Sequence, residues 1–145
     1  MKISTKGRYA LRMLLDLAEH KDEGFIPLKE IAKRQEISKQ YLEQIVSLLN
    51  TSDMLRTNRG KLGGYMLAKD PADCTVGKVL RITERGLAPV ACLEHEVNHC
   101  DRVDLCKTLP MWTGLHSAIL EYLDGVTLQD LMEQCQDPNS LQYII

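Results

Sequence analysis

Residues 28–67, LKEIAKRQEISKQYLEQIVSLLNTSDMLRTNRGKLGGYML, carry the pattern that decides the fold. Apolar residues recur at helical spacing over a short segment after Pro27 and again over a longer one after Ser38, with a brief connection between them. Ser38 stands where a helix N-cap belongs. After residue 53 the pattern changes to two short strands, 54–58 and 65–68, joined by a glycine-rich basic loop. We therefore predict a helix-turn-helix followed by a β-hairpin.

The sequence before this stretch predicts one further helix. Ser4 or Thr5 can cap it, and an apolar stripe at helical spacing runs from Tyr9 to Ala18. Helix, short helix, turn, helix and basic hairpin is the element order of a winged helix-turn-helix. We expect this domain to span residues 1–70, with the helix-turn-helix at about 28–51 and the wing at about 54–68, in a mainly α fold with a small β-hairpin.

The remainder of the chain predicts two more segments. Residues 71–109 should hold a connecting helix that starts after Thr75 and an irregular loop with three cysteines. Residues 110–145 should hold a long helix that begins near Pro110 and a short last helix opened by a capping box, Thr127 to Asp130. A wide apolar stripe marks the long helix: Met111, Trp112, Leu115, Ala118, Ile119, Tyr122 and Leu123.

Composition restricts the class of protein. With 44% hydrophobic and 26% charged residues the chain is typical of a globular protein, and it lacks both a membrane-length apolar run and a secretory signal, so we expect a cytoplasmic location. The net charge of −2 conceals an asymmetry, because residues 1–70 carry +4 and residues 71–145 carry −6. The basic front half favours contact with a polyanion, although such a split also arises by chance.

The predicted second helix of the helix-turn-helix has the chemistry of a DNA-reading element. Its N-terminus directs free backbone N–H groups and a positive dipole end at phosphate. Its exposed face carries Lys39, Gln40, Glu43 and Gln44. Glutamate accepts from cytosine and glutamine pairs with adenine, while the wing cations Arg59 and Lys61 suit an adjacent groove. The alternative is an ordinary solvated helix face beside a solvated hairpin, and some winged helices bind only protein.

The cysteines Cys92, Cys100 and Cys106 are spaced Cys-x7-Cys-x5-Cys. The spacing is not that of a zinc ribbon or a thioredoxin-like site, but three thiolates in one irregular loop suit a soft metal or an iron–sulfur cluster. Unligated thiols are the alternative. We expect Cys74 and Cys135, outside the loop, to be small buried hydrophobic residues.

Three motifs resemble the IscR/NsrR/CymR family of bacterial regulators: residues 1–10 (MKISTKGRYA), Ser38-x-x-Tyr41-Leu42-Glu43-Gln44-Ile45, and Arg59-Gly60-x-x-Gly63-Gly64-Tyr65-x-Leu67. The resemblance extends to about residue 123. It implies a homodimeric winged-helix transcription regulator that binds double-stranded DNA, with residues 110–123 in the dimer interface, Glu43 discriminating target sites and Arg59 as the wing arginine. The same motifs add six residues to the expected DNA-contacting set: Ser4, Thr5, Arg8, Tyr9, Ser38 and Tyr65.

The resemblance also implies a cofactor. Cluster-binding members carry three cysteines in this loop, usually spaced Cys-x5-Cys-x5-Cys, whereas the cluster-free cysteine-metabolism members lack them. It therefore implies a [2Fe-2S] cluster on Cys92, Cys100 and Cys106 that senses cluster supply, oxidants or nitric oxide and controls cluster-biogenesis genes.

Two features depart from that family pattern. The first cysteine interval here is two residues longer. Leu109 and Arg8 occupy the positions where members place a fourth ligand, so that ligand stays open. The candidates are a bound water, Glu43, and the residues near the cysteines: Glu94, His95, Glu96, His99, Asp101 and Asp104.

Other functions fit the sequence less well. A cluster-free thiol or metabolite sensor and a zinc-bound regulator belong to the same class of protein. An iron–sulfur carrier or redox protein belongs to another, and the basic wing with the exposed Gln40, Glu43 and Gln44 argues against it. No pairing of a nucleophile with a base supports an enzyme.

Overall fold

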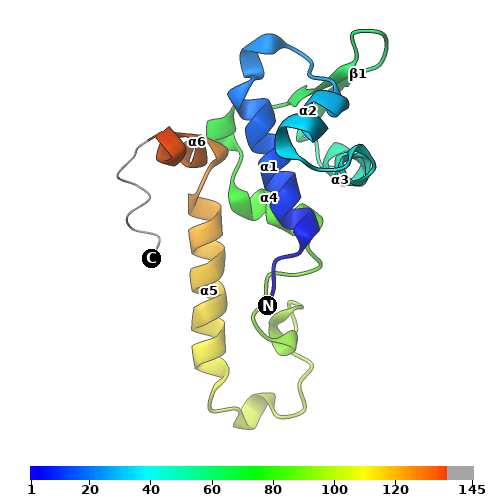
Figure 1. The fold of residues 1–145 in the computed structure, drawn as a ribbon. Helices are drawn as coiled ribbons and strands as arrows, with labels where there is room; N and C mark the ends of the chain where they lie inside the picture. The colour runs from blue at the N-terminus through cyan, green and yellow to red at the C-terminus, as the bar shows by residue number, and fades with distance from the viewer. Residues whose placement is uncertain (137–145) are drawn as a thin grey trace.

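The computed structural model describes residues 1–136 of the 145-residue chain. Residues 137–145, which end the expected 110–145 segment, lie outside it. Figure 1 shows a helical head, a hairpin at one end of it, and a long helix that reaches away toward an irregular loop. The described elements follow in chain order: α1 (Thr5–Glu19), η1 (Lys21–Glu23), α2 (Leu28–Gln35), α3 (Lys39–Asn50), β1 (Leu55–Asn58), β2 (Gly64–Leu67), η2 (Pro71–Asp73), α4 (Val76–Thr83), η3 (Ala91–Leu93), η4 (Val103–Leu105), α5 (Leu109–Gly125) and α6 (Leu128–Gln136). This architecture confirms the predicted mainly α fold with a two-stranded hairpin.

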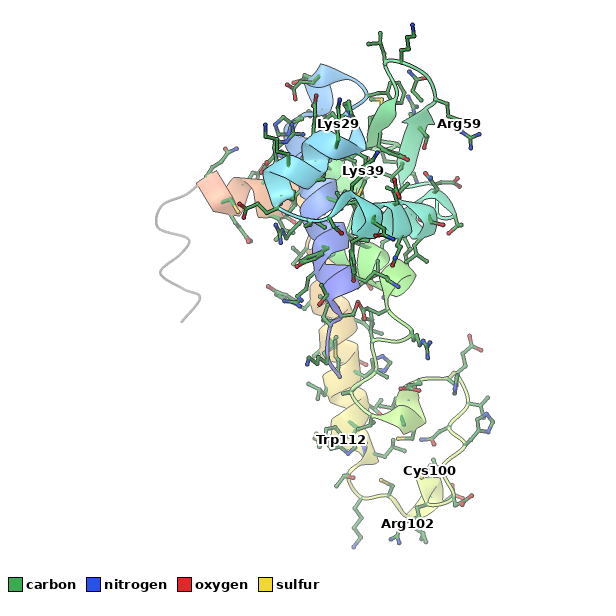
Figure 2. The ribbon with its side chains drawn as sticks, turned by 45° about the vertical axis from the view of Figure 1, so that its right-hand side comes forward. Lys29, Lys39, Arg59, Cys100, Arg102 and Trp112 are labelled. Carbon is green, nitrogen blue, oxygen red and sulfur yellow. The ribbon has the colours of Figure 1, made fainter. Side chains whose placement is uncertain are left out.

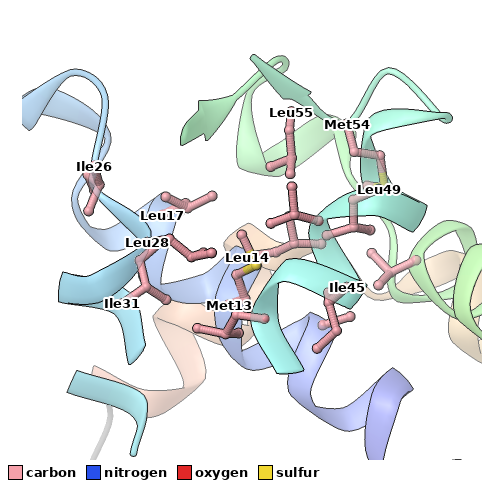
Figure 3. Packing of buried hydrophobic residues seen from close by; sticks show 14 of the residues in the cluster. Met13, Leu14, Leu17, Ile26, Leu28, Ile31, Ile45, Leu49, Met54 and Leu55 are labelled. Atoms are coloured by element: carbon pink, nitrogen blue, oxygen red, sulfur yellow. The ribbon is translucent and has the colours of Figure 1, made fainter. Parts of the chain in front are cut away.

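The core of the head forms where α1, α2, α3 and the hairpin meet (Figure 3). α1 contributes Met13, Leu14 and Leu17, each at most 1% exposed. α2 adds Ile31, and α3 adds Ile45 and further apolar side chains at helical spacing. Burying a side chain of this size stabilises the fold by about 1.5–3 kcal/mol. This packing fixes α3 against α1 and leaves the opposite face of α3 free.

The turn between α2 and α3 is short and well defined. Glu36 is the C-cap that follows α2, and it adopts a left-handed conformation with φ of 54°. The next residue, Ile37, is buried at 5% exposure and anchors the turn in the core. Ser38 then caps α3, as predicted, because its Oγ accepts a hydrogen bond of 3.1 Å from the Tyr41 N–H.

The hairpin is antiparallel, and Leu55 pairs with Leu67 at its base. A third segment joins it, because Ile26 and Tyr65 exchange two backbone hydrogen bonds of 2.9 Å. Gly64 allows this approach, since a Cβ there would collide with the Ile26 backbone. Met54 and Ala68, expected at the strand ends, lie just outside the strands.

The C-terminal elements return the chain to α4. Thr75 caps α4 through its Oγ1, and the Val76 N–H donates to the Val126 carbonyl at 2.8 Å. Arg81 on α4 binds both carboxylate oxygens of Asp124 on α5, at 2.5 and 2.8 Å. The predicted capping box of α6 is present, because the Asp130 carboxylate accepts from Thr127 while the Thr127 hydroxyl accepts from the Asp130 N–H.

α5 has an unusual environment for an apolar helix. Leu120 and Leu123 pack partly against α4, but none of the seventeen residues of α5 is buried. Met111, Leu115 and Tyr122 are 53%, 42% and 72% exposed. Within residues 1–136, no helix has both the length and the apolar character needed to cross a bilayer.

Candidate functional site

The exposed face of α3 gathers the polar side chains that the sequence assigned to base reading. Lys39, Gln40, Glu43 and Gln44 are all exposed, while Leu42 and Ile45 on the other face are buried. The N-terminal end of α3 carries the positive end of the helix dipole, and the exposed Lys39 adds a positive charge there. This end of α3 therefore suits an anionic groove.

The hairpin loop extends the same cationic end of the molecule. Arg59 and Lys61 are both exposed in this loop, and Figure 2 shows Arg59, Lys39 and Lys29 of α2 together at the end opposite the cysteine loop. Tyr65 is half-buried because its side chain packs against the core of the head, so only part of it faces solvent.

The N-terminus of α1 has a mixed character. Thr5 and Arg8 are exposed, and Arg8 Nη2 donates to Thr5 Oγ1 at 3.0 Å. Ser4 caps α1, as predicted, because its Oγ accepts from the Gly7 N–H at 3.1 Å, and the same hydroxyl donates to Glu84 at 2.7 Å. Its hydroxyl is therefore already occupied in the free protein.

Tyr9 connects α1 to α3. Its ring meets the ring of Tyr41 edge-on at 5.5 Å between centroids, and the guanidinium of Arg12 lies 5.1 Å from the Tyr9 centroid. Arg12 also donates to the backbone carbonyl of Gln35, the last residue of α2. These contacts set the position of α3 relative to α1.

Lys6 is a candidate that sequence reasoning missed. A surface groove of about 500 Å³ is lined by Lys6 together with Gln40, Glu43 and Gln44. Lys6 thus lies beside the residues expected to read bases, although it belongs to α1. Only the packing of α1 against α3 places it there, so no spacing within the sequence could have revealed it.

A buried carboxylate joins α1 to the end of α2. Asp16, with its side chain 1% exposed, accepts hydrogen bonds from Arg34 at 2.6 and 3.0 Å and from Gln35 Nε2 at 3.0 Å. Burial opposes ionisation and is the largest single influence on its pKa, but the bonds from Arg34 and Gln35 outweigh it and lower the pKa of Asp16. His20 Nδ1 lies 3.7 Å from the same carboxylate. An ionised Asp16 therefore ties α1 to the turn that precedes α3.

The cysteine loop lies at the far end of the molecule (Figure 2). Cys92 and Cys106 are partly exposed and Cys100 is exposed, and all three are free thiols. A hydrogen bond with the Thr108 hydroxyl is the main cause of a lowered pKa of the Cys106 thiol. Within residues 1–136, no group of three histidine, cysteine or acidic side chains is assembled closely enough to hold a metal ion. The loop supplies suitable ligands without bringing them together.

The two remaining cysteines differ from each other. Cys74 is buried, as predicted, and burial raises the pKa of its thiol to about 11. The prediction that Cys135 is also buried is wrong, because Cys135 is exposed. The apolar positions of α6 pack through Leu128 and Leu131, and Cys135 near its C-terminal end lies beyond that packed face.

A capped helix with an exposed polar face, a short turn before it and a basic hairpin beside it define a winged helix-turn-helix, a fold typical of DNA-binding proteins. Comparison with known proteins places it more narrowly. The family model of the iron-dependent transcriptional regulator Rrf2 matches residues 3–134, and the chain belongs to this family of DNA-binding transcriptional regulators.

Two curated relatives and one solved structure illustrate its position in the family. The transcriptional regulator CymR of Bacillus subtilis is 40% identical over 131 residues, covering 90% of this chain and 89% of CymR. IscR of Aliivibrio salmonicida is 39% identical over 132 residues, covering 91% of this chain and 77% of IscR. The structure of T. potens IscR superimposes with a TM-score of 0.73 at 35% identity, covering 93% of this chain and 88% of that one. The relatives are named transcriptional regulators, not enzymes, as the sequence led us to expect.

Proposed function

We propose that this DNA-binding regulator senses iron–sulfur cluster status through Cys92, Cys100 and Cys106. The main observation in support is that these three thiols are free and at least partly exposed within one irregular loop. Thiolates are the preferred ligands of iron–sulfur clusters. When bound, a [2Fe-2S] cluster supplies a solvent-accessible group that oxidants and nitric oxide attack.

Overall similarity does not separate this proposal from its main alternative. The chain is 40% identical to CymR and 39% identical to IscR, so a cluster-free sensor of cysteine metabolism has equal support from identity alone. The three loop cysteines favour the cluster sensor, since they match the cluster-binding members of the family and not the cluster-free ones.

The donor set fits a cluster in its chemistry. Cys106 already has a lowered pKa, which favours the thiolate form that binds metal. The loop must close to bring three sulfurs around one cluster, and the absence of regular helices between η3 and η4 leaves its backbone free to do so. His95, His99 and Glu94 are exposed and are candidates for the fourth ligand.

The apolar face of α5 supports a homodimer. Met111, Leu115 and Tyr122 are largely exposed in the single chain, and such a stripe on a soluble protein marks an interaction surface. Two recognition helices joined through α5 would read half-sites about one helical turn apart. We accordingly assign DNA binding to residues 1–70, sensing to 71–109 and dimerisation to the segment from residue 110, in a cytoplasmic protein.

The test is an absorption spectrum of protein purified without oxygen, with iron and sulfide analysis. We expect visible charge-transfer bands and one cluster per chain. Single Cys→Ser changes at positions 92, 100 and 106 should each abolish these bands. Cys135→Ser is the matched control, since Cys135 is exposed but outside the loop. A colourless protein without iron would refute the proposal, and bound zinc or bare thiols would identify the alternatives.

A further inference from the structure

Glu84 forms a contact between two distant parts of the chain. It directly follows α4, and its carboxylate accepts hydrogen bonds from Ser4, eighty positions away in sequence. The Ser4 hydroxyl donates at 2.7 Å, and the Ser4 N–H lies 3.3 Å from both carboxylate oxygens. Hydrogen bonds to an ionised acceptor are roughly twice as strong as neutral ones.

The hydrogen-bonded chain continues into α1. The Ser4 hydroxyl donates to Glu84 and accepts from the Gly7 N–H at 3.1 Å, so Glu84 orients the group that caps α1. Gly7 is itself buried, and a Cβ at this position would collide with the Glu84 carboxylate. The close approach of Glu84 thus depends on glycine at position 7.

Glu84 also stands at the entrance to the cysteine loop. An open cleft of about 700 Å³ surrounds it, and the cleft is lined from two sides. Thr5, Lys6 and Tyr41 come from the DNA-facing end of the head. Val90 and Ala91 come from the loop, and Cys92 immediately follows Ala91. The contact between Glu84 and Ser4 is therefore a direct link between these two regions.

We propose that Glu84 is a positioning residue that couples the conformation of the 86–108 loop to the first turn of α1. This inference rests on the proposed sensing role of the loop. Closure of the loop around a ligand moves the chain that follows Glu84. That movement changes the hydrogen bonds between Glu84 and Ser4. The positions of Thr5, Lys6 and Arg8 relative to DNA change as a result. Only a difference in DNA affinity between the two loop states makes this contact a switch.

The test modifies the loop without requiring iron. Cluster-free full-length protein carrying Cys135→Ser is treated with iodoacetamide, which alkylates the accessible loop cysteines but not the buried Cys74. The Gly7 amide is followed by ¹⁵N NMR, and the dissociation constant for an operator duplex is measured at one salt concentration. We expect alkylation to shift the Gly7 amide and to change the DNA affinity at least fivefold.

Glu84→Ala should abolish both responses, and Glu84→Gln should retain part of them, because its amide oxygen still accepts from Ser4. Glu84→Gln also keeps the size of the side chain if the alanine variant folds poorly. Glu133→Ala, which removes an exposed carboxylate from α6, is the charge-matched control and should respond like the native chain. The proposal is overturned if alkylation does not shift the Gly7 amide resonance. It is also overturned if the amide shift and the change in DNA affinity are as large in Glu84→Ala as in the native chain. Absence of iron from the purified protein would instead count against the proposed cluster alone.

Discussion

Removing Arg34 should destabilise the protein more than neutralising the carboxylate that it binds. Asp16 is 1% exposed in the native chain, and Arg34→Ala leaves it with Gln35 and His20 as its remaining partners. Breaking a buried ion pair from one side costs about 3–5 kcal/mol, and these remaining partners place the expected loss near 3 kcal/mol. The buried charge that remains is the cause.

Asp16→Asn should cost less, although it removes the same ion pair. The Arg34 side chain is 33% exposed, so it can turn toward water when its partner is lost. The remaining cost is that of the lost charged hydrogen bonds, about 1.5–3 kcal/mol, reduced by this rehydration. The larger loss of stability expected for Arg34→Ala than for Asp16→Asn therefore follows from the unequal exposure of Arg34 and Asp16.

Urea unfolding followed by circular dichroism at pH 7 measures both values. The protein concentration is held fixed, because the stability of the proposed dimer would depend on it. Lys33→Ala is the control, since it removes an exposed cation from the same helix and should change stability by no more than about 0.5 kcal/mol. The reasoning fails if Arg34→Ala matches Lys33→Ala or proves milder than Asp16→Asn.

Four further predictions concern the same regions. Because the pKa of Asp16 is lowered in the folded chain, its stabilising effect is present above the unfolded carboxyl pKa of about 3.9 and is lost as the pH falls through the lower folded pKa. The difference in free energy of unfolding between the native chain and Arg34→Ala should therefore become smaller when urea unfolding is repeated at successively lower pH. Arg59→Ala should weaken operator binding by about 1–3 kcal/mol, whereas Glu43→Ala should change which duplexes are accepted; unchanged binding of both variants in a fluorescence titration would refute their place in the interface. Lys6→Ala should reduce the magnitude of the slope of log affinity against log salt by about 1, and an unchanged slope would exclude a phosphate contact. Replacing Leu115 and Ile119 with glutamate should give monomers in light scattering, and a persistent dimer would place the interface elsewhere.

Local patterns were enough to predict most of the head. The cap at Ser38, the cap expected at Ser4 or Thr5, the helix start after Thr75 and the box at Thr127 depend on interactions within a few residues. All four are present, with Ser4 as the cap of α1. The helix-turn-helix and hairpin followed from hydrophobic periodicity for the same reason. Their boundaries differ from expectation by about one residue at the strands.

Contacts between distant residues could not be predicted from spacing. Nothing near Lys6 indicates that it lies beside Glu43, and nothing near Glu84 indicates that it meets Ser4. The error at Cys135 has a related cause, because its position on the apolar stripe of α6 does not reveal where the partner surface ends. Such features depend on how helices pack, which a single sequence encodes only indirectly.

The return of the chain to α4 has a consequence for how such regulators diversify. Thr75 pairs with Thr127 and Arg81 binds Asp124, so everything between Glu84 and α5 departs from the head and rejoins it at a fixed place. Lengthening a loop such as 86–108 by two residues costs roughly 0.1 kcal/mol in closure entropy. The loop can therefore change in length and sequence while the packing of the head, with α3 and the hairpin, stays the same. The chain as a whole is almost equally similar to CymR and to IscR, at 40% identity over 131 residues and 39% identity over 132 residues.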